Sequence, residues 1–328
     1  MENNIDFVIP WVDSTDENWQ REKEKYKSDI LTDSRDIRYR DLDNLQYWFR
    51  GVEKFAPWVN RIHFITWGHL PKWLDTNHPK LNIVNHHDYI PREYLPTFSS
   101  HVIELNLHRI KDLSEQFVFF NDDIFITRPV SSRDFFVDGI PKDMAVMDIA
   151  FKKDEVHGSA VHNSVYLVNK YFNKRESIHN HFTKWYNPIY GGKLIKTLLL
   201  SPWKYFTGFY TSHLANAYLK STFVEVWERE YERLAFTSSN KFRDMRDCMQ
   251  FVFKFWQIAS GNFVPAKPLG RSYSIGESLD RITSAIQTQR HKLICMNDND
   301  YIEDFEDSRQ SIIKSFEKVF PDKSEFEI

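Results

Sequence analysis

The chain has 328 residues, of which 41% are hydrophobic and 16% aromatic, and this composition supports a large buried core and excludes a disordered protein. Its 43 basic and 46 acidic residues give a net charge of −3, which excludes a general attraction for nucleic acid or anionic lipid, so any polyanion must be bound locally. Two cysteines without a CxxC pair exclude a disulfide framework and predict a reducing compartment. Because no signal-like or membrane-spanning run is recognisable, we expect a cytoplasmic protein.

The first half of the chain alternates short apolar runs with helical segments, which is the pattern of a parallel βαβ sheet. Strands are predicted at residues 5–12, 61–68, 81–86 and 117–122, with two more at 144–151 and 162–169. Helices are predicted around residues 42–52 and 99–113, where apolar side chains recur every three or four positions. We therefore expect an α/β, Rossmann-like fold with a mostly parallel sheet.

The character of the sequence changes after Asn169. Residues 170–260 are rich in aromatic side chains and predict helices that form an insertion packed on the sheet. The segment 301–320 predicts an amphipathic helix that Pro321 ends. We expect three parts: an α/β core at 1–169, a helical insertion at 170–260, and a return to the core with a C-terminal helix at 261–328.

Two neighbouring carboxylates, Asp122 and Asp123, follow Asn121 at the end of a predicted strand. In open α/β sheets this edge is where ligands bind. The residue types alone are equally compatible with an ordinary Asn-Asp turn. The apolar runs on both sides favour a site, because a buried carboxylate is costly unless a metal or a cation meets it.

The preceding predicted helix contributes a second polar group. His101, Glu104 and His108 are spaced so that they share one helical face. A solvated polar face is the plain alternative. Because the helix leads into the strand that ends at Asp122 and Asp123, the combined pattern favours a functional site over either piece alone.

Other candidates are weaker when each is taken alone. Asp13 and Asp16 follow the first strand, where a nucleotide contact is natural, but the chain has neither GxGxxG nor a P-loop. Phosphate is then expected to meet Arg or Lys, and the clusters at 38–41 and 241–247 are candidates, although each taken alone is more typical of a surface charge run. His213 stands in an uncharged segment, which alone is typical of a structural histidine.

Four groups of segments together resemble the Stealth family of sugar-phosphate transferases. The first is "IDFVIPWVDSTDENW"; the second runs from "RYRDLDNLQYWFRGVEKFAPWVNRIHFITWGHLPKWL" through "LPTFSSHVIELNLHRIKDLSEQFVFFNDDIFI"; the third includes "TSHLANAY" and "FRDMRDCMQF"; the fourth is "HKLICMNDN" with "VFPDKSEFE". They span most of the chain, and the second, an ordered match of many positions, is the most specific.

The resemblance implies an enzyme of bacterial capsular or cell-wall polysaccharide synthesis, related to the catalytic core of animal lysosomal-enzyme N-acetylglucosamine-1-phosphotransferase. Such enzymes transfer a hexose or N-acetylhexosamine 1-phosphate from a UDP-sugar to a hydroxyl of an acceptor glycan, and UMP leaves. The resemblance also implies a glycosyltransferase-A-like fold in which 1–169 bind the nucleotide sugar and 170–260 complete the active site. A divalent cation, Mg²⁺ or Mn²⁺, is expected to bridge the diphosphate oxygens.

Carried over residue by residue, the family's essential positions fall on Glu104, Asp123, His213 and Arg243, which we expect to be catalytic. Asp123 and His213 are alternative bases, Arg243 or Arg246 clamps the phosphate, and Glu104 positions the acceptor hydroxyl or holds His108. The expected substrate-binding residues are Trp11, Val12, Asp13, Asp16, Arg38, Asp41, His108, Arg109, Asn121, Asp247 and Asn297. The expected metal ligands are Asp122, Asp123 and Asp298, with Asp122 either a ligand or a support.

The expected partners are a UDP-sugar donor and an acceptor oligosaccharide or polysaccharide, lipid-linked or free, and no nucleic acid. A homodimer stays open, as does a peripheral contact at the inner face of the cell membrane through residues 203–210, for which core packing is the alternative. Two other functions also stay open: a metal-dependent glycosyltransferase that releases UDP, and a non-catalytic carbohydrate-binding protein.

Overall fold

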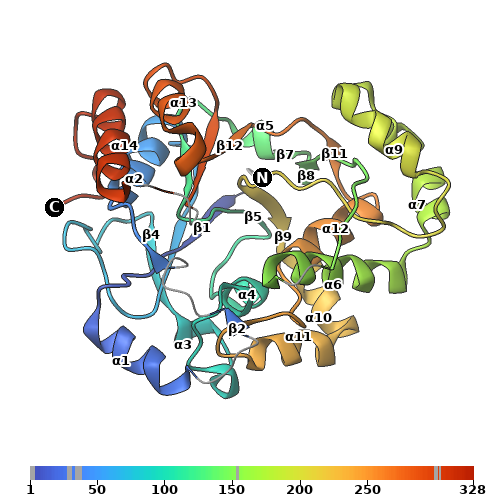
Figure 1. The fold of residues 1–328 in the computed structure, drawn as a ribbon, viewed down its shortest axis with the longest axis horizontal. Helices are drawn as coiled ribbons and strands as arrows, with labels where there is room; N and C mark the ends of the chain where they lie inside the picture. The colour runs from blue at the N-terminus through green and yellow to red at the C-terminus, as the bar shows by residue number, and fades with distance from the viewer. Residues whose placement is uncertain (1–3, 28–31, 34–38, 153–154, 299–301, 303) are drawn as a thin grey trace.

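A five-stranded sheet forms the centre of the structure, a computed structural model that describes residues 4–27, 32–33, 39–152, 155–298, 302 and 304–328. Its strand order is β4 (Leu81–Asn85), β3 (Ile62–Thr66), β1 (Ile5–Pro10), β5 (Gln116–Phe119) and β9 (Asn216–Leu219). The first four run parallel, and β9 joins the edge of β5 antiparallel (Figure 1). The four strands predicted before residue 123 and the mostly parallel α/β class are confirmed.

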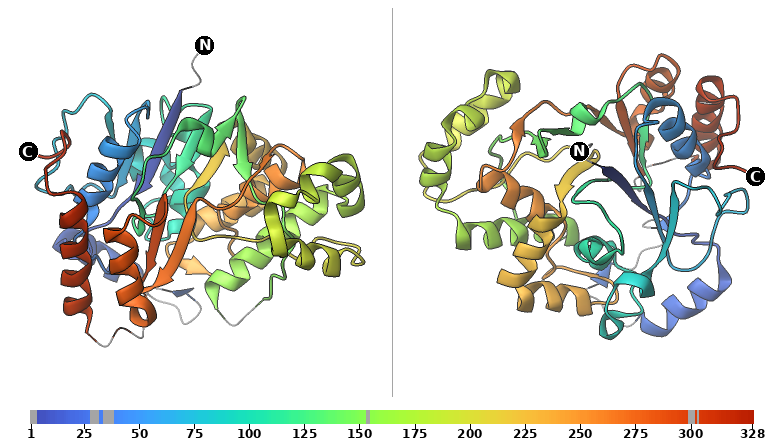
Figure 2. Two further views of the ribbon diagram at one scale, coloured as in Figure 1. Left: turned by 90° about the horizontal axis from the view of Figure 1, so that it is seen from above. Right: turned by 180° about the vertical axis from the view of Figure 1, so that it is seen from behind.

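Two hydrophobic cores cover the two faces of the sheet, because successive side chains of a strand point to opposite faces. Phe7 and Ile9 of β1 belong to one core and Val8 to the other, and all three are fully buried. Helices α2 (Leu45–Phe55), α13 (Ile275–Gln287) and α14 (Phe305–Val319) contribute to the first core. Helices α4 (Ser100–Leu105), α6 (Val156–Tyr171), α10 (Lys220–Arg229), α11 (Tyr231–Ser239) and α12 (Phe251–Ala259) contribute to the second (Figure 2).

Three small sheets extend this arrangement. The largest contains β12 (Gly270–Ser274), β13 (Leu293–Asn297) and β6 (Ile124–Ile126), in that order. The others pair β10 (Arg243–Asp244) with β2 (Thr32–Asp33), and β11 (Val264–Pro265) with β8 (Ile140–Asp143) and β7 (Phe136–Val137). Because β6 follows β5 directly and pairs with β13, the turn that carries the acidic pair lies between two sheets.

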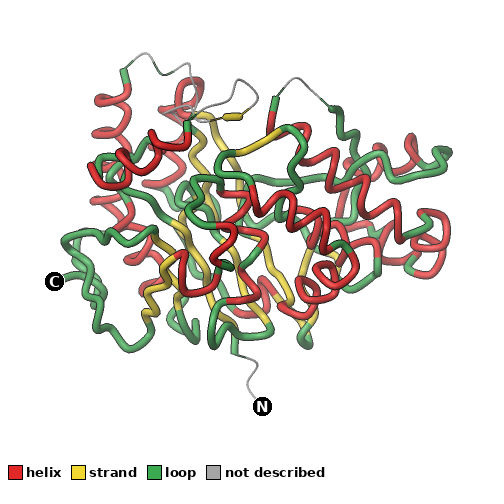
Figure 3. The backbone as a smooth tube through the Cα atoms, turned by 90° about the horizontal axis from the view of Figure 1, so that it is seen from below, coloured by secondary structure: helices red, strands yellow, loops and turns green. Residues whose placement is uncertain are grey.

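The remaining helices are shorter or peripheral. They are α1 (Glu17–Tyr26), α3 (His86–Tyr89), α5 (Ser132–Phe135), α7 (Lys174–Asn180), α8 (Phe182–Trp185) and α9 (Leu194–Leu200), with 3-10 turns at Arg92–Tyr94, Leu107–Arg109 and Pro188–Lys193. Strands gather in the middle and helices outside them (Figure 3). Among the helices described here, none combines the length and the apolar character that crossing a membrane requires.

Two of the predicted strands do not form, and one predicted helix is shorter than expected. Residues 162–169 lie within helix α6, where the buried residues Ala160, Ser164 and Val168 recur every four positions, a helical period. Residues 144–151 form no named strand, and Met147 makes only an isolated bridge with Phe209.

The helix expected over 99–113 ends early. Helix α4 stops at Leu105, and a separate 3-10 turn begins at Leu107. Asn106 interrupts it: its side-chain amide donates to the carbonyl of Val102 at 2.9 Å and to Ser238 Oγ at 3.2 Å, which competes with the helical hydrogen bonds. The helix predicted around 42–52 is confirmed as α2, and that at 301–320 as α14.

The division of the chain at residues 169 and 260 stays a prediction. Within 170–260 the structure places helices α7 to α12, but also β9, which is part of the central sheet. This segment therefore contacts the core through backbone hydrogen bonds as well as through side-chain packing.

Asp6, a fully buried carboxylate on β1, joins three segments of the core. It accepts hydrogen bonds from Asn60 Nδ2 at 2.7 Å, the Ser114 backbone amide at 2.8 Å and His63 Nε2 at 3.1 Å. Burial by itself raises the pKa of Asp6, but the hydrogen bonds from His63, Asn60 and Ser114 outweigh it and leave the pKa below its ordinary value of 3.8. The ionised form is therefore the one that the fold stabilises.

Asp6→Ala is expected to lower the free energy of unfolding by about 3 kcal/mol near neutral pH, because three buried donors lose their acceptor. Since the folded pKa lies below the unfolded one, the stabilisation by Asp6 is present above 3.8 and is lost as the pH falls through the folded value. Urea unfolding at several pH values measures both effects. Asp112→Asn, at an exposed carboxylate, is the control, and equal stability of Asp6→Ala and wild type would contradict this role.

Candidate functional site

A cleft of about 400 Å³ opens where β1 and β5 end. Because parallel strands of an open α/β sheet expose a crevice at their carboxyl ends, the residues that follow each strand meet there. Eleven of the residues selected from the sequence line it: Trp11, Val12, Asp41, Glu104, Asn121, Asp122, Asp123, His213, Arg243, Asn297 and Asp298. The four candidate catalytic residues thus come together although they span residues 104 to 243.

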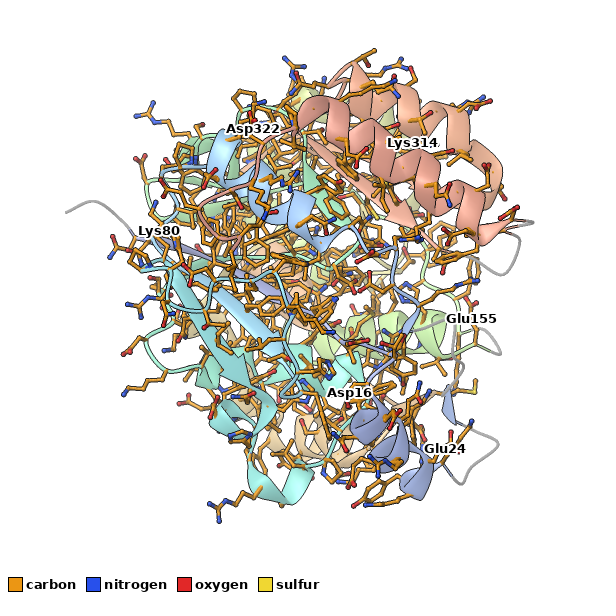
Figure 4. The ribbon with its side chains drawn as sticks, turned by 90° about the vertical axis from the view of Figure 1, so that its left-hand side faces the viewer. Asp16, Glu24, Lys80, Glu155, Lys314 and Asp322 are labelled. Atoms are coloured by element: carbon orange, nitrogen blue, oxygen red, sulfur yellow. The ribbon has the colours of Figure 1, made fainter. Side chains whose placement is uncertain are left out.

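Asp13 and Asp16 do not line the cleft and are engaged in local turns instead. Asp16 caps helix α1 by accepting the backbone N–H of Trp19 at 2.7 Å (Figure 4). Asp13 Oδ1 accepts from both the backbone N–H and the hydroxyl of Thr15, at 2.8 and 2.6 Å. Arg38 lies outside the described residues.

His108 and Arg109 also lie away from the cleft lining, because the early end of α4 removes them from the face of Glu104. The His108 ring packs near Phe223 and Trp227, with ring centroids 6.1 and 5.8 Å away, and burial lowers the pKa of His108 to about 3. The Arg109 guanidinium lies 4.7 Å from the centroid of Trp227. Both side chains contact the aromatic core.

Asp123 occupies the turn between β5 and β6. Its backbone carbonyl accepts from the Met296 amide at 3.0 Å, which ties the turn to β13. Its Oδ2 accepts from the Cys295 thiol at 3.3 Å and lies 3.5 Å from His213 Nε2. Within the described part of the chain, its Oδ1 is buried without a hydrogen-bond partner. One carboxylate oxygen is therefore held by the protein while the other is left unsatisfied.

Asp122 is exposed as a residue and lines the cleft, yet its carboxylate is crowded by protein atoms. This loss of hydration, followed by the negative charges of Asp123 and Asp41, raises the pKa of Asp122 to about 7. Burial likewise raises the pKa of Asp41, although the Trp11 indole donates to its Oδ2 at 2.9 Å. Asp41, Asp122 and Asp123 bring three carboxylates to this end of the cleft, which favours a positive ion there.

Glu104 and Arg243 approach the cleft from α4 and β10. Burial raises the pKa of Glu104, and the nearby His101 and Arg243 oppose this shift. Arg243 Nη2 donates to Ser100 Oγ at 2.7 Å, which holds the guanidinium beside α4. The neighbouring Arg246 pairs with both oxygens of Asp244, at 2.7 and 2.8 Å, and is not among the cleft-lining residues.

A buried pair joins His101, which the sequence places on one polar face with Glu104, to Asp247, an expected substrate-binding residue that does not line the cleft. Asp247 Oδ2 lies 2.9 Å from His101 Nδ1 and also accepts the Asp244 amide at 2.8 Å, while its Oδ1 accepts from Asn240 at 2.6 Å. His101 lines the cleft but Asp247 does not, so Asp247 orients the ring from behind. The spacing of His101 to Glu104 was visible in the sequence, whereas its partner 146 residues away was not.

Asn297 is the last residue of β13 and Asp298 follows it, at the far side of the cleft. Asn297 Nδ2 donates to Ser272 Oγ at 2.7 Å, and Asp298 forms a two-point ion pair with Arg40, at 2.7 and 3.0 Å. Asp298 is thus paired with Arg40, whereas none of the contacts given above pairs Asp122 or Asp123 with an arginine or a lysine.

Oxygen ligands suit Mg²⁺ and Mn²⁺, and the carboxylates of Asp122 and Asp123 offer them. In the described residues, ligand atoms of Asp123, His213 and Cys295 also lie within 4.8 Å of one another. Burial and the charge of Asp123 raise the pKa of Cys295 well above its ordinary value, so its neutral thiol is a poor ligand. Asp123 Oδ1 has no hydrogen-bond partner among the described residues, and the surroundings of Asp122 disfavour its negative charge. A hard divalent cation therefore suits this pair of carboxylates best.

Asp122→Asn is expected to alter how stability depends on pH. The folded pKa of about 7 exceeds the ordinary 3.8, so the folded protein loses stability as the pH rises between these values. Between about pH 5 and about pH 8, the melting temperature of Asp122→Asn should therefore fall less than that of wild type when no divalent cation is present. Asp112→Asn is the matched control, and parallel curves for Asp122→Asn and wild type would contradict the assignment.

Comparison with known proteins reveals clear relatives. Residues 3–30 match the family model described as Stealth protein CR1, conserved region 1. Residues 38–143 match Stealth protein CR2, conserved region 2, and residues 284–328 match Stealth protein CR4, conserved region 4. The third region that the sequence suggests, around residues 210–250, stays a prediction.

Curated relatives match from end to end. Capsular polysaccharide phosphotransferase WcwK of Streptococcus pneumoniae is 43% identical over 98% of both chains. Receptor polysaccharide phosphotransferase WefC of Streptococcus oralis is 39% identical over 99% of this chain and 100% of its own. Exopolysaccharide phosphotransferase cps2G of Lactiplantibacillus plantarum is 37% identical over 99% of this chain and 96% of its own.

Solved structures that match include galactosyltransferase LgtC in complex with donor and acceptor sugar analogs, at 9% identity and a TM-score of 0.39, covering 94% of this chain and 95% of that one. Mouse xyloside xylosyltransferase 1 matches at 9% identity and a TM-score of 0.37, covering 90% of this chain and 98% of that one.

With three conserved regions matched and relatives about 40% identical along their whole length, the chain belongs to the Stealth protein family.

Proposed function

We propose that this protein is a transferase of capsular or cell-wall polysaccharide synthesis that moves a sugar 1-phosphate from a UDP-sugar to a hydroxyl of an acceptor glycan. The acceptor oxygen attacks the phosphorus that bears the sugar, the bond from that phosphorus to the oxygen bridging to UMP breaks, and UMP leaves. The observation that carries this proposal is the convergence of Glu104, Asp123, His213 and Arg243 on one cleft. The printed names of the end-to-end relatives, polysaccharide phosphotransferases, agree with it.

His213 is proposed to take the proton of the acceptor hydroxyl. Its Nε2 lies 3.5 Å from Asp123 Oδ2 and 3.2 Å from Asn121 Nδ2, so it can be oriented at the cleft while its ring stays accessible, with 43% of the side chain exposed. A histidine imidazole can take up and release a proton, which suits this role. Asp123 is proposed to stabilise the charged ring that results.

Arg243 is proposed to bind the phosphate whose negative charge grows as the nucleophile attacks. Its position at the cleft beside Ser100 favours it over Arg246, which is paired with Asp244. Glu104, buried at the same cleft, is proposed to accept a hydrogen bond from the acceptor sugar. Both His213 and Arg243 belong to residues 170–260, which supports the idea that this segment completes the active site.

Asp122 and Asp123 are proposed to hold a divalent cation, Mg²⁺ or Mn²⁺, which when bound supplies positive charge to the diphosphate oxygens. Trp11, Val12, Asp41 and Asn297 are proposed to line the nucleotide end, with the loop that leads to Asp13 and Asp16 at its border. Asp298 is proposed to line the nucleotide end as well, but only when its ion pair with Arg40 opens.

The test is incubation of the protein with a panel of UDP-sugars, Mg²⁺ or Mn²⁺, and short acceptor glycans, followed by nucleotide analysis and mass measurement of the products. The proposal expects UMP and an acceptor heavier by a sugar phosphate. Release of UDP with transfer of the sugar alone would replace it with an ordinary glycosyltransferase. Binding of glycan without turnover of any donor would point instead to a carbohydrate-binding protein.

A further inference from the structure

Helix α9 and the turn after it present apolar side chains to solvent. Along Leu194–Leu200 the buried residues are Thr197 and Leu200, whereas Ile195, Leu198 and Leu199 are 59%, 57% and 67% exposed. Trp203 and Tyr205, which follow, are each 56% exposed. These five side chains, Ile195, Leu198, Leu199, Trp203 and Tyr205, are called the α9 patch below.

The α9 patch is not the result of a helix packed loosely on the protein. The Thr197 hydroxyl accepts the backbone N–H of Met147 at 3.1 Å, and Lys174 Nζ donates to the carbonyls of Leu200 and Ser201, both at 3.0 Å. The inner face of α9 is therefore fixed, and its outer leucines face away from the core. Exposed clusters of large apolar side chains mark interaction surfaces in native proteins.

The chain segment that carries the α9 patch is positively charged. Between residues 177 and 224 the chain contains no aspartate or glutamate but five lysines, in a protein with a net charge of −3. Lys193, Lys196 and Lys204 flank the α9 patch and are exposed. Asp148 pairs with Lys196 at 2.7 Å, while Lys193 lies over the ring of Tyr210 and Lys204 over that of Tyr205, at 4.0 and 5.2 Å.

We propose that the α9 patch is a docking surface for an anionic lipid bilayer. Leucine and isoleucine side chains enter the apolar layer, tryptophan and tyrosine favour the headgroup region, and lysines meet the acidic headgroups. The α9 patch supplies all three on one short segment. In Figures 1 and 2, α7 and α9 lie at the end of the molecule opposite α14 and the C-terminus.

A second copy of this chain is the alternative occupant, and charge disfavours it. In a twofold dimer the same surface meets itself, so Lys193 and Lys204 of both copies would come together, whereas Lys196 is paired with Asp148. Because residues 177–224 contain no acidic side chain, the segment that carries the α9 patch could not pair these charges within itself. An anionic bilayer neutralises the lysines and covers the leucines at the same time.

Flotation of the full chain with vesicles tests the proposal, using phosphatidylcholine alone or mixed with phosphatidylglycerol. Wild type is expected to bind the phosphatidylglycerol vesicles at least about tenfold more tightly, with the difference reduced at high salt. Leu198→Asp with Leu199→Asp should lower this binding at least about tenfold. Lys193→Gln and Lys204→Gln should each lower it about fivefold on anionic vesicles only.

Val224→Asp is the matched control, because Val224 is 40% exposed on helix α10, outside the α9 patch, and should bind vesicles like wild type. Circular dichroism verifies that each variant is folded, and no step depends on the enzymatic activity proposed above. The proposal is overturned if folded wild type does not bind phosphatidylglycerol vesicles, or if the Leu198→Asp, Leu199→Asp variant binds as well as wild type. A wild-type dimer that this variant dissociates, without vesicle binding, would overturn it in favour of self-association.

Discussion

Asp123→Asn is expected to lower the rate of sugar-phosphate transfer by at least about 1000-fold while the protein stays folded. The substitution keeps the shape of the side chain but removes its charge. It takes away both the proposed ligand for a divalent cation and the negative partner that lies 3.5 Å from His213. An amide oxygen can still accept the hydrogen bond from Cys295, so the turn between β5 and β6 should be retained.

The measurement for Asp123 is kcat with a UDP-sugar and acceptor glycan, together with thermal unfolding in the presence and absence of Mn²⁺. Wild type should gain stability from the ion, and Asp123→Asn should gain much less. Asp112→Asn, whose carboxylate is 64% exposed on the surface, is the matched control and should behave like wild type in both assays. A folded Asp123→Asn protein with the wild-type rate would remove Asp123 from the proposed mechanism.

His213→Ala is expected to lower kcat about 100- to 10,000-fold, because the acceptor hydroxyl loses the group that takes its proton. The side chain is 43% exposed in the cleft, so added imidazole should enter the space left by the ring and restore part of the rate. His87→Ala, at a histidine whose side chain is 69% exposed elsewhere, is the control and should need no rescue.

The pH profile separates the two candidate bases. If His213 is the base, kcat/KM of wild type falls at acid pH as the ring becomes protonated, and His213→Ala loses that limb of the profile. If Asp123 is the base, His213→Ala keeps the acid limb and imidazole does not restore activity. The second result would reassign the proton transfer to Asp123 and leave His213 as a positioning residue.

Local patterns were sufficient for the core of the fold. The strands β1, β3, β4 and β5 are short runs of valine, isoleucine and phenylalanine, and helix α2 shows a clear helical period. Such signals depend on neighbours in sequence, so they are readable without the fold. They failed at residues 162–169, where β-branched residues imitate a strand but the burial period is that of helix α6.

Part of the candidate site could also be predicted from local sequence patterns. The Asn-Asp-Asp turn, Glu104, His213 and Arg243 lie in segments that resemble the family, and the structure brings them to one cleft. His108 was misjudged because α4 ends at Leu105, about two turns before the predicted end, and a single side-chain amide that competes for a carbonyl, that of Asn106, is hard to weigh in a sequence.

The parallel sheet, the family resemblance and the acidic turn at the end of β5 can all be recognised from the amino-acid sequence. Three features become visible only in the folded chain: Asp247 orients His101, the Cys295 thiol donates a hydrogen bond to Asp123, and the leucines of α9 face outward. The first two contacts join residues 146 and 172 positions apart. The third follows from which side of a short helix meets the core. An apolar period marks a face, but only packing decides whether that face is covered.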